Sequence, residues 1–424
     1  MFKKLGDLNV VGYKVRLFPT KVQEKIFYEY FGMSRFVYNK TIDLQEEYYE
    51  ANKYNEDAYK FLGFIDLRNK IRELQDTSYP WLANYSTESI RGAVQDCVKA
   101  YEFFKNKEIH NRHPKYKSRI YSKKQFYTRP DRLLITENFV CLSSIGKIKY
   151  CNSYGNEILG IGDKNSKHYK YTHFYNSRIS FDGLYFYLTF NILRDEKHQI
   201  HSYWNYSNNE EWQEKEFSEP IGIDVGLKNE KWFVDSTGTK IERPDSTVLN
   251  KKINRLQRKY DRQKKLNLSK NSSFMEQHPN GSKNMQKTRE KINKCFKKIT
   301  NRRRNAVHEY GCRLLDKKPS AIVMESISLN RIIYKNNNVS ILNQMVMDAA
   351  LYESMQIIQN KLEYNGIPVI RADANYPSSQ LCSCCGYRQD IGKRKTYQCP
   401  NCGTVIDRDL NAAINLKKLA YCSL

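Results

Sequence analysis

Two pairs of cysteines near the end of the chain constrain its fold more strongly than any other feature. Cys382 and Cys385 are two residues apart, Cys399 and Cys402 are spaced in the same way, and a glycine follows each pair. Glycine permits the tight turn of a metal knuckle. Thirteen residues separate the two pairs, and four thiolates at this spacing close a tetrahedron around one zinc ion. The sequence therefore predicts a structural zinc site.

Other interpretations of these cysteines are less consistent with their spacing. Cys384 could replace a neighbouring ligand, but the two-residue gap and the following glycine favour Cys382 with Cys385 and leave Cys384 as a spare thiol. Buried free cysteines or a redox dithiol would rarely fall into two pairs that each end in glycine. Five of the eleven cysteines lie between Cys382 and Cys402, and such clusters in a reducing compartment are first interpreted as metal ligands.

Length and charge predict a protein of several domains that binds a polyanion. At 424 residues the chain exceeds the size at which one hydrophobic core stops growing. The formal net charge is +25, and residues 251–304 concentrate it, with 19 Lys or Arg against 3 Asp or Glu. Such a stripe is typical of a surface that faces phosphates, so we expect nucleic acid as the partner.

No apolar run approaches the roughly 20 residues that a membrane-spanning helix needs. The start of the chain also lacks the apolar segment and the cleavage site of a secretory signal. We therefore expect no membrane partner and a cytoplasmic location.

The first half predicts helices flanked by strands. Tyr13–Phe18 alternates as a short strand, Thr20 is placed as a helix N-cap, and Gln23–Tyr49 and residues 56–107 have helical patterns.

Strand-like runs follow at Leu133–Leu142 and at Arg178–Leu193, the latter passing through an Asp182-Gly183 turn. Residues 195–219 are polar without a clear hydrophobic period, which indicates a domain boundary.

Three acidic residues in the second half form a candidate catalytic set. Asp224 lies in the strand-like IGIDVG, where Gly222 and Gly226 share its face and would leave open space for a metal and a phosphodiester. Glu325 ends the apolar run AIVM, where a carboxylate needs a partner or a metal. Asp409 lies in the first turn of a helix that the segment DRDLNAA opens.

Each acid alone has an ordinary explanation as a turn cap, a salt bridge or a helix N-terminal charge, and Asp407 is an alternative to Asp409. Together, a strand Asp, a strand Glu and a helix Asp are what an RNase H-like fold uses to gather three carboxylates at one edge of its sheet. Shared carboxylates hold two divalent ions about 3.5–4 Å apart for phosphodiester hydrolysis. We expect two Mg²⁺ ions, with Mn²⁺ as a substitute.

The motifs resemble the TnpB proteins of insertion-sequence transposons, and the related miniature type V CRISPR effectors, across nearly the whole chain. YKVRLFPTKVQ, GMSRFVYNK, HPKYKS and LSSIGKIKY carry the resemblance in the first half, and GIDVGLKN, VMES, SSQLCSCCG, CPNCG and DRDLNAA carry it in the second. The resemblance implies catalysis by Asp224, Glu325 and Asp409. It selects Asp409 over Asp407, because the family's aspartate lies two residues before the asparagine.

The fold that this resemblance implies is α/β and multidomain. An RNase H-like (RuvC) catalytic domain carries an inserted four-cysteine zinc ribbon, and a small β-barrel wedge domain interrupted by a helical recognition insert precedes it. The expected ranges are 1–24 and 113–194 for the wedge, 25–112 for the recognition domain, 195–219 for a linker, 220–377 and 406–424 for the nuclease, and 378–405 for the zinc ribbon.

The function that the resemblance implies is an RNA-guided DNA endonuclease. A guide RNA would be held by the basic surface, and double-stranded DNA beside a short adjacent motif would be cut in the RuvC site. One alternative is a nuclease-inactive, RNA-guided DNA-binding repressor, which loss of any of the three acids would have favoured; all three are present. Another is an RNA-independent DNA nuclease or transposition factor, against which the helical insert and the wedge-like half argue.

Overall fold

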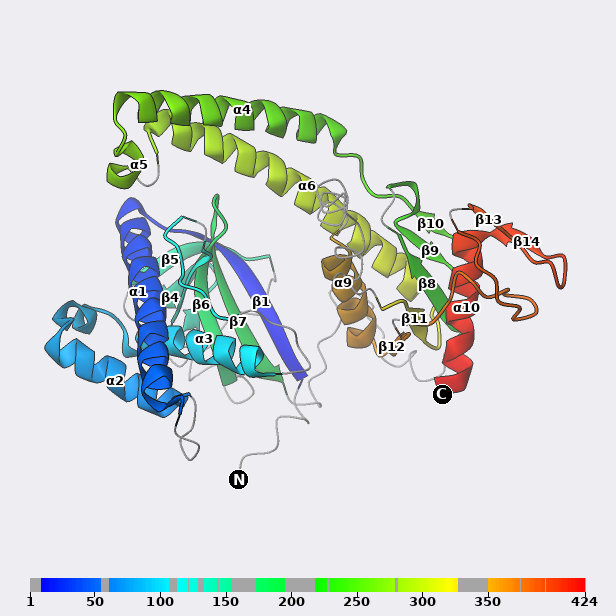
Figure 1. Ribbon diagram of the computed structural model, residues 1–424, viewed down its shortest axis with the longest axis horizontal. Helices are drawn as coiled ribbons and strands as arrows, with labels where there is room; N and C mark the ends of the chain where they lie inside the picture. The colour runs from blue at the N-terminus through cyan, green and yellow to red at the C-terminus, as the bar shows by residue number, and fades with distance from the viewer. Residues whose placement is uncertain are drawn as a thin grey trace. The chain divides into compact units, whose positions relative to one another are not determined.

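The computed structural model describes residues 9–54, 61–106, 113–120, 122–128, 133–142, 145–153, 173–194, 218–226, 229–278, 281–326, 350–373, 375–392 and 394–423 (Figure 1). The chain divides into two compact units, Met1–Ile200 with Leu266–Gln286 and His201–Lys265 with Lys287–Leu424. The predicted linker at residues 195–219 lies outside the described residues except for its last two. None of the described helices is long and apolar enough to cross a membrane.

The first unit is built on a seven-stranded sheet with helices packed on it. The strand order is β2-β6-β7-β1-β5-β4-β3, and the pairings between neighbouring strands are antiparallel. Its elements are β1 (Asn9–Phe18), α1 (Lys21–Asn52), α2 (Phe64–Thr77), η2 (Pro80–Asn84), α3 (Thr87–Lys105), β2 (Lys124–Tyr127), β3 (Leu134–Ile135), β4 (Phe139–Leu142), β5 (Gly146–Cys151), β6 (His173–Phe181) and β7 (Phe186–Arg194).

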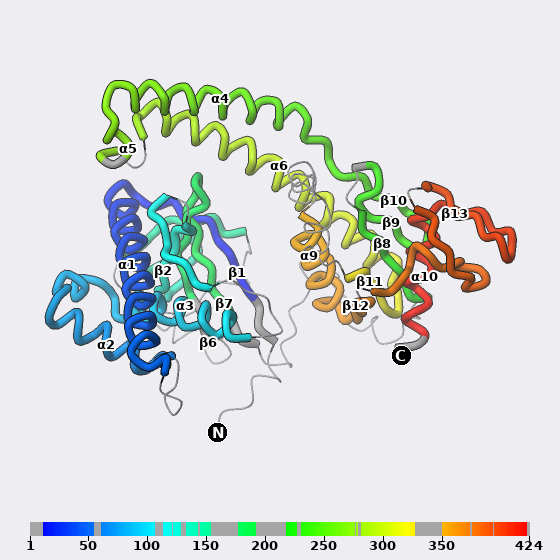
Figure 2. Tube along the Cα trace, in the orientation of Figure 1, coloured from blue at the N-terminus to red at the C-terminus, as the bar shows by residue number. Residues whose placement is uncertain are grey.

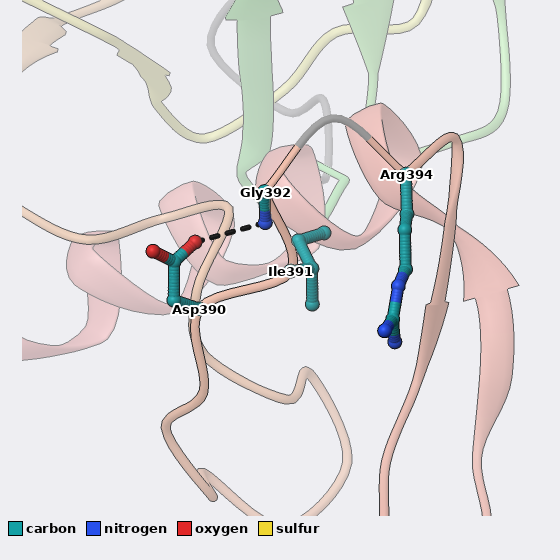
Figure 3. Close-up of a pocket in the computed structure, with 4 residues that line it drawn as sticks. All are labelled: Asp390, Ile391, Gly392 and Arg394. Carbon is teal, nitrogen blue, oxygen red and sulfur yellow. Dashed lines mark hydrogen bonds between the residues drawn. The ribbon is translucent and has the colours of Figure 1, made fainter.

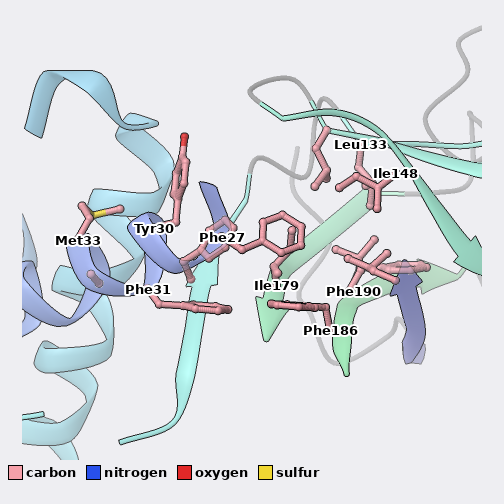
Figure 4. Packing of buried hydrophobic residues seen from close by; sticks show 14 of the residues in the cluster. Phe27, Tyr30, Phe31, Met33, Leu133, Ile148, Ile179, Phe186 and Phe190 are labelled. Atoms are coloured by element: carbon pink, nitrogen blue, oxygen red, sulfur yellow. The ribbon is translucent and has the colours of Figure 1, made fainter. Parts of the chain in front are cut away.

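Alternation along β1 explains how this core forms. Tyr13, Val15 and Leu17 are buried on one face of the strand, as a period of two requires. They join a cluster that includes Phe27 and Phe31 of α1 (Figure 4). Thr20 caps α1 in a capping box with Gln23, whose backbone N–H donates to the Thr20 hydroxyl. The predicted strand, cap and long helix are therefore confirmed.

The remaining predictions in this unit are confirmed in part. The strand expected over Leu133–Leu142 is wrong as a single element, because the chain turns between β3 and β4, which pair with each other. The turn at Asp182 is present, and the carboxylate of Asp182 accepts hydrogen bonds from the backbone N–H groups of Leu184 and Tyr185. In the described part of the sheet β2 and β3 are its two edges, so closure into a barrel stays a prediction.

The second unit has a five-stranded mixed sheet in the order β10-β9-β8-β11-β12. Strands β8, β11 and β12 are parallel, whereas β9 and β10 are antiparallel to their neighbours. The elements are β8 (Ile221–Val225), η8 (Asn229–Lys231), β9 (Phe233–Asp235), β10 (Lys240–Ile241), α4 (Thr247–Lys270), α6 (Lys283–Asp316), β11 (Ile322–Met324), α9 (Leu351–Tyr364), β12 (Val369–Arg371), β13 (Thr396–Gln398), β14 (Val405–Asp407) and α10 (Arg408–Ser423). The stretch Leu266–Gln286, which includes α5 (Phe274–Gln277) and the adjoining ends of α4 and α6, is grouped with the first unit.

Helices cover both faces of this sheet, which is why its central strands are apolar. Ile221 and Ile223 of β8 pack on one face with residues of α6 and α9. On the opposite face Val323 of β11 packs with Leu416 of α10. Successive residues of β8 and β11 therefore alternate between the α6–α9 side and the α10 side.

Helices α4 and α6 form a long hairpin between β10 and β11 (Figure 2). Ile253 and Leu256 of α4 pack against Cys295 of α6, and the Thr288 hydroxyl donates to the Gln263 side-chain oxygen at 3.0 Å. The basic stripe predicted at residues 251–304 coincides with this hairpin, and most of its Lys and Arg side chains are exposed. The seam, which is the contact between α4 and α6, is thus apolar and narrow, and the remaining surface of the hairpin is positively charged.

Candidate carboxylate and zinc sites

The three acidic residues predicted as a set come to the same edge of the second sheet. Strands β8 and β11 are parallel, and Ile223 pairs with Met324 at the end of the ladder. One residue further, Asp224 and Glu325 come level with each other on the α10 side of the sheet. This edge is the carboxyl end of the parallel strands, where open α/β sheets place their ligands.

Gly222 explains how Asp409 reaches this edge. A Cβ atom at Gly222 would lie 2.0 Å from the backbone oxygen of Ala413 and 2.4 Å from the backbone nitrogen of Lys417, so α10 lies directly on β8. Asp409 precedes Ala413 by one helical turn, just as Asp224 lies two residues beyond Gly222 on the same face. The expectation of open space over this glycine is wrong, because the backbone of α10 occupies it.

Burial and mutual repulsion define the electrostatics of the carboxylate site. Burial raises the pKa of Asp224 well above its usual range, and the charges of Glu325 and Asp409 raise it further. Burial also raises the pKa of Glu325. Three carboxylates gathered in a partly buried site carry an electrostatic cost that bound cations remove. Their oxygen atoms are the donors that Mg²⁺ and Mn²⁺ prefer.

Asp407 and Asp409 have different surroundings although two residues separate them. An Asp407 side-chain oxygen accepts from the backbone N–H of Asp409 at 3.0 Å and of Leu410 at 3.2 Å, so Asp407 is the N-cap of α10. Although burial opposes it, hydrogen bonds from Lys231, Leu410 and Lys240 lower the pKa of Asp407 to about 2. The side chain of Asp407 thus caps the N-terminus of α10, while Asp409 projects from the first turn.

Lys231 is the residue at this site that sequence reasoning missed. Its ammonium nitrogen lies 2.7 Å from a side-chain oxygen of Asp409 and 2.9 Å from one of Asp407. Although burial opposes it, hydrogen bonds to these two carboxylates raise the pKa of Lys231. No sequence pattern marks this lysine, since 176 residues separate it from Asp407.

The four predicted zinc ligands form a compact cluster. The ligand atoms of Cys382, Cys385, Cys399 and Cys402 all lie within 4.8 Å of one another. The Sγ atoms are 3.6 Å apart in the Cys382–Cys402 pair and also in the Cys385–Cys399 pair. A tetrahedron with Zn–S bonds of about 2.3 Å has sulfur atoms about 3.8 Å apart. The thiolates therefore fit one zinc ion.

The turns and strands around the cysteines support the cluster. Gly386 and Gly403 have φ angles of 74° and 72°, and their N–H groups donate to the carbonyls of Cys382 and Cys399. These are the knuckle turns that the glycines predict. Strands β13 and β14 pair antiparallel beside them. Cys384 is exposed and lies outside the cluster, as expected for a spare thiol.

Two buried asparagines connect the cysteine cluster to α10. The side-chain amide of Asn411 donates to the carbonyl of Leu381 at 2.6 Å, and its oxygen accepts from the Ser383 N–H at 2.8 Å. The Asn415 amide donates to the carbonyls of Leu381 and Ser378. The first knuckle is thereby tied to the helix that carries Asp409. The sequence signal for these contacts is limited to the asparagine of the DRDLNAA motif, and that motif predicts no contact with the cysteines.

The set of carboxylates differs from the cysteines in spacing. Among the residues that the structure describes, the four cysteines are the group whose ligand atoms all lie within 4.8 Å. The carboxylates are close enough for their charges to interact but are not gathered to that degree.

A surface pocket lined by Asp390, Ile391, Gly392 and Arg394 contains none of the predicted site residues (Figure 3). We assign that pocket no role.

The geometry thus defines a mixed α/β protein with a four-cysteine cluster that is suited to zinc. Comparison with family models gives two matches. A helix-turn-helix domain model matches residues 11–54, and a Cas12f1-like TNB domain model matches residues 352–416. The first region is β1 with the single long helix α1, and the second runs from α9 through the cysteine cluster into α10.

Some curated relatives carry provisional names as RNA-guided DNA endonucleases, and others are named TnpB-like proteins. A Streptomyces pristinaespiralis protein is 29% identical over 46% of this chain and 44% of its own length. InsQ of Escherichia coli (strain K12) is 23% identical over 95% of this chain and 90% of its own length. The TnpB-like protein L79 of Acanthamoeba polyphaga mimivirus is 25% identical over 47% of this chain and 36% of its own length. The chain thus spans less than half of two of these relatives.

Among solved structures, a Cas12f1–sgRNA–target DNA complex aligns at 16% identity with a TM-score of 0.31, covering 96% of this chain and 99% of that one. A CRISPR-Cas12f ternary complex aligns at 14% identity with a TM-score of 0.34, covering 94% and 82%. The two family models and the curated relatives confirm the resemblance predicted from the motifs. The chain is thus similar to TnpB-like proteins and to proteins named as RNA-guided DNA endonucleases.

Proposed function

We propose that this protein is an RNA-guided DNA endonuclease that hydrolyses phosphodiesters at Asp224, Glu325 and Asp409. The observation that carries the proposal is the convergence of these acids from β8, from the end of β11 and from the first turn of α10. We further propose that the second sheet is RNase H-like (RuvC). Its parallel β8, β11 and β12, with an antiparallel hairpin beside β8, support this assignment.

Each acid contributes a carboxylate at a fixed place. Asp224 is positioned by the β8 ladder, Glu325 follows the last paired residue of β11, and Asp409 is set by the contact of α10 with Gly222. Bound Mg²⁺ ions would activate a water nucleophile and stabilise the leaving oxygen. Burial is the main reason for the raised pKa of Asp224, and the negative charges of Glu325 and Asp409 add to it; bound cations would relieve that repulsion.

The remaining parts of the protein supply binding and support. We propose that the four cysteines hold one structural zinc ion that fixes the first knuckle against α10. The basic α4–α6 hairpin and the overall charge of +25 would bind phosphate backbones of guide RNA and double-stranded DNA target. The wedge and recognition parts would lie in residues 1–194 and the nuclease with its zinc ribbon in residues 220–424, as the resemblance implies.

The test is to express the chain with its native flanking DNA, purify it, sequence the RNA that copurifies, and assay magnesium-dependent cleavage of plasmids that match that RNA. We expect a discrete structured RNA and guide-matched cutting. Asp224→Asn should lower the cleavage rate by at least about a hundredfold, since a metal-holding carboxylate is lost, and should leave RNA copurification unchanged. Asp261→Asn, the same substitution at an exposed position of α4, should cut like the wild type.

The other outcomes separate the alternative functions. Bound RNA without cutting by the wild type would favour the repressor. Cutting without RNA would favour the RNA-independent nuclease. Cutting by Asp224→Asn at the wild-type rate would contradict the assignment of the acids.

A further inference from the structure

The carboxylate site contains a cation of its own. The Lys231 ammonium group lies 2.7 Å from an Asp409 side-chain oxygen and 2.9 Å from an Asp407 side-chain oxygen. Asp407 has a second cation in Lys240 at 3.2 Å, and its other side-chain oxygen caps α10. In the described residues Lys231 is the cation that forms an ion pair with Asp409.

The position of Lys231 is set by the fold and not only by its flexible side chain. The next residue, Trp232, is fully buried in the core on the α6–α9 side of the sheet. The Trp232 N–H donates to the Ile241 carbonyl and the Trp232 carbonyl accepts from the Gly226 N–H, both at 3.0 Å. The backbone beside Lys231 is therefore held on both sides. Its side chain is only 22% exposed.

A lysine held in this way has a direct electrostatic consequence for metal binding. Asp409 belongs to the proposed magnesium site, and one carboxylate oxygen cannot keep a close ammonium partner while it binds a divalent cation at full strength. The Lys231 charge also repels any cation that approaches Asp224 and Glu325. Conversely, it offsets the repulsion among the three carboxylates when no metal is bound.

We propose that Lys231 is a built-in counter-ion that competes with the divalent cation for Asp409, so that metal binding requires the lysine to leave that carboxylate. Lys231 is a positioning residue in this scheme. It stabilises the metal-free site and raises the metal concentration at which the site fills. The inference rests on the proposed metal site, and it concerns the affinity of that site, not its existence.

Metal binding by the purified, zinc-loaded protein tests this competition without a cleavage assay. Mn²⁺ is titrated into the full chain and free Mn²⁺ is followed by electron paramagnetic resonance. Lys231→Met removes the charge and keeps most of the volume, so its Kd for Mn²⁺ should fall by on the order of tenfold. Lys231→Arg keeps a charge and should remain near the wild-type Kd. In thermal unfolding, Lys231→Met should be less stable than the wild type without Mn²⁺, and its stability should rise more than that of the wild type when Mn²⁺ is added.

Lys240→Met is the matched control. Lys240 pairs with Asp407 at 3.2 Å, as Lys231 does, but forms no described ion pair with Asp409. Loss of the Lys240 charge should leave the Kd for Mn²⁺ within about twofold of the wild type. Salt screens the interaction between an exposed charge and a metal ion that it does not contact. Lys231→Gln provides a second uncharged variant, and circular dichroism checks the folding of each protein.

The possible failures are distinguishable. In the first case, the wild type binds Mn²⁺ more tightly than Asp224→Asn, but Lys231→Met and Lys231→Gln bind it no more tightly than Lys240→Met. The competition is then refuted and the metal site stands. If the wild type binds Mn²⁺ no better than Asp224→Asn, the metal site itself fails, and the inference fails with it.

Discussion

At the scale of single residues, a glycine, Gly222, determines how closely α10 approaches the carboxylate site. Gly222 has no side chain, and this allows the backbone of α10 to approach β8 closely. The helix packs on the strand with Ala413 over Gly222, and this brings Asp409 near Asp224. The glycine thus determines where an acid nearly 190 residues away along the chain is placed.

Gly222→Ala should therefore disturb both stability and the carboxylate site. The new Cβ would lie 2.0 Å from the Ala413 carbonyl oxygen, and backbone cannot rotate away as a side chain can. We expect a loss of about 1–3 kcal/mol in the free energy of unfolding, measured by urea denaturation, together with a lower cleavage rate.

Gly32→Ala is the control, because a Cβ at Gly32 of α1 would meet nothing within 4 Å. Alanine is the better helix former there, so this variant should be unchanged or stabilised by up to about 1 kcal/mol. Equal effects of the two substitutions would contradict the role given to Gly222.

At the scale of elements, α10 joins the two candidate metal sites. Its first turn carries Asp409, and Asn411 and Asn415 further along the helix bind the backbone of the first cysteine knuckle. Both asparagines are buried, at 0% and 2% exposure. Their polar groups are satisfied only while the knuckle keeps its shape. The cysteine cluster therefore supports the end of the helix at which the acids converge.

Loss of zinc should weaken this support before it affects the rest of the fold. Cys399→Ser removes one thiolate of the set, so the folded yield should fall, and protease digestion should cut first within residues 378–405. A chelator applied to the wild type should produce the same cleavage pattern. Cys384→Ser, at an exposed thiol outside the cluster, should behave like the wild type. Equal protease patterns for the Cys399→Ser and Cys384→Ser proteins would argue against a structural zinc.

At the scale of the whole molecule, the excess of basic residues matters more than any one of them. The α4–α6 hairpin has a narrow apolar seam and exposes most of the basic residues of its stripe. Charge of this kind gives affinity through counterion release and little sequence preference. It suits a protein in which base pairing would supply specificity.

Neutralising part of the stripe should change the salt dependence of binding. Arg255, Arg258 and Arg262 are exposed on α4, and their joint change to Gln should reduce the slope of log K against log salt for duplex DNA by about 2–3. Fluorescence anisotropy at several salt concentrations measures the slope. The control is a second triple variant, in which the exposed Arg68, Lys70 and Arg72 on α2 are changed to Gln. It removes the same amount of charge from a different helix. An unchanged slope in the α4 variant would exclude the stripe from the interface.

Local chemistry made much of this protein predictable from its sequence. The strand period placed Asp224 opposite the apolar face of β8, and glycine after each cysteine pair placed the knuckle turns. The cap at Thr20 and the helix after it follow from neighbouring residues. The strand predicted at residues 133–142 is two strands, because the polar residues Thr136, Glu137 and Asn138 form a turn between β3 and β4.

The sequence by itself determined the ligand types, which are four thiolates in two knuckles and three acids on strand, strand and helix, and it determined a strongly basic stripe at residues 251–304. These depend on the spacing of near neighbours, which the chain specifies directly. Only the tertiary structure decided that α10 fills the space over Gly222 and that Lys231 pairs with Asp409. Such contacts join residues far apart in the chain, and packing and charge select them only after the strands and helices have assembled.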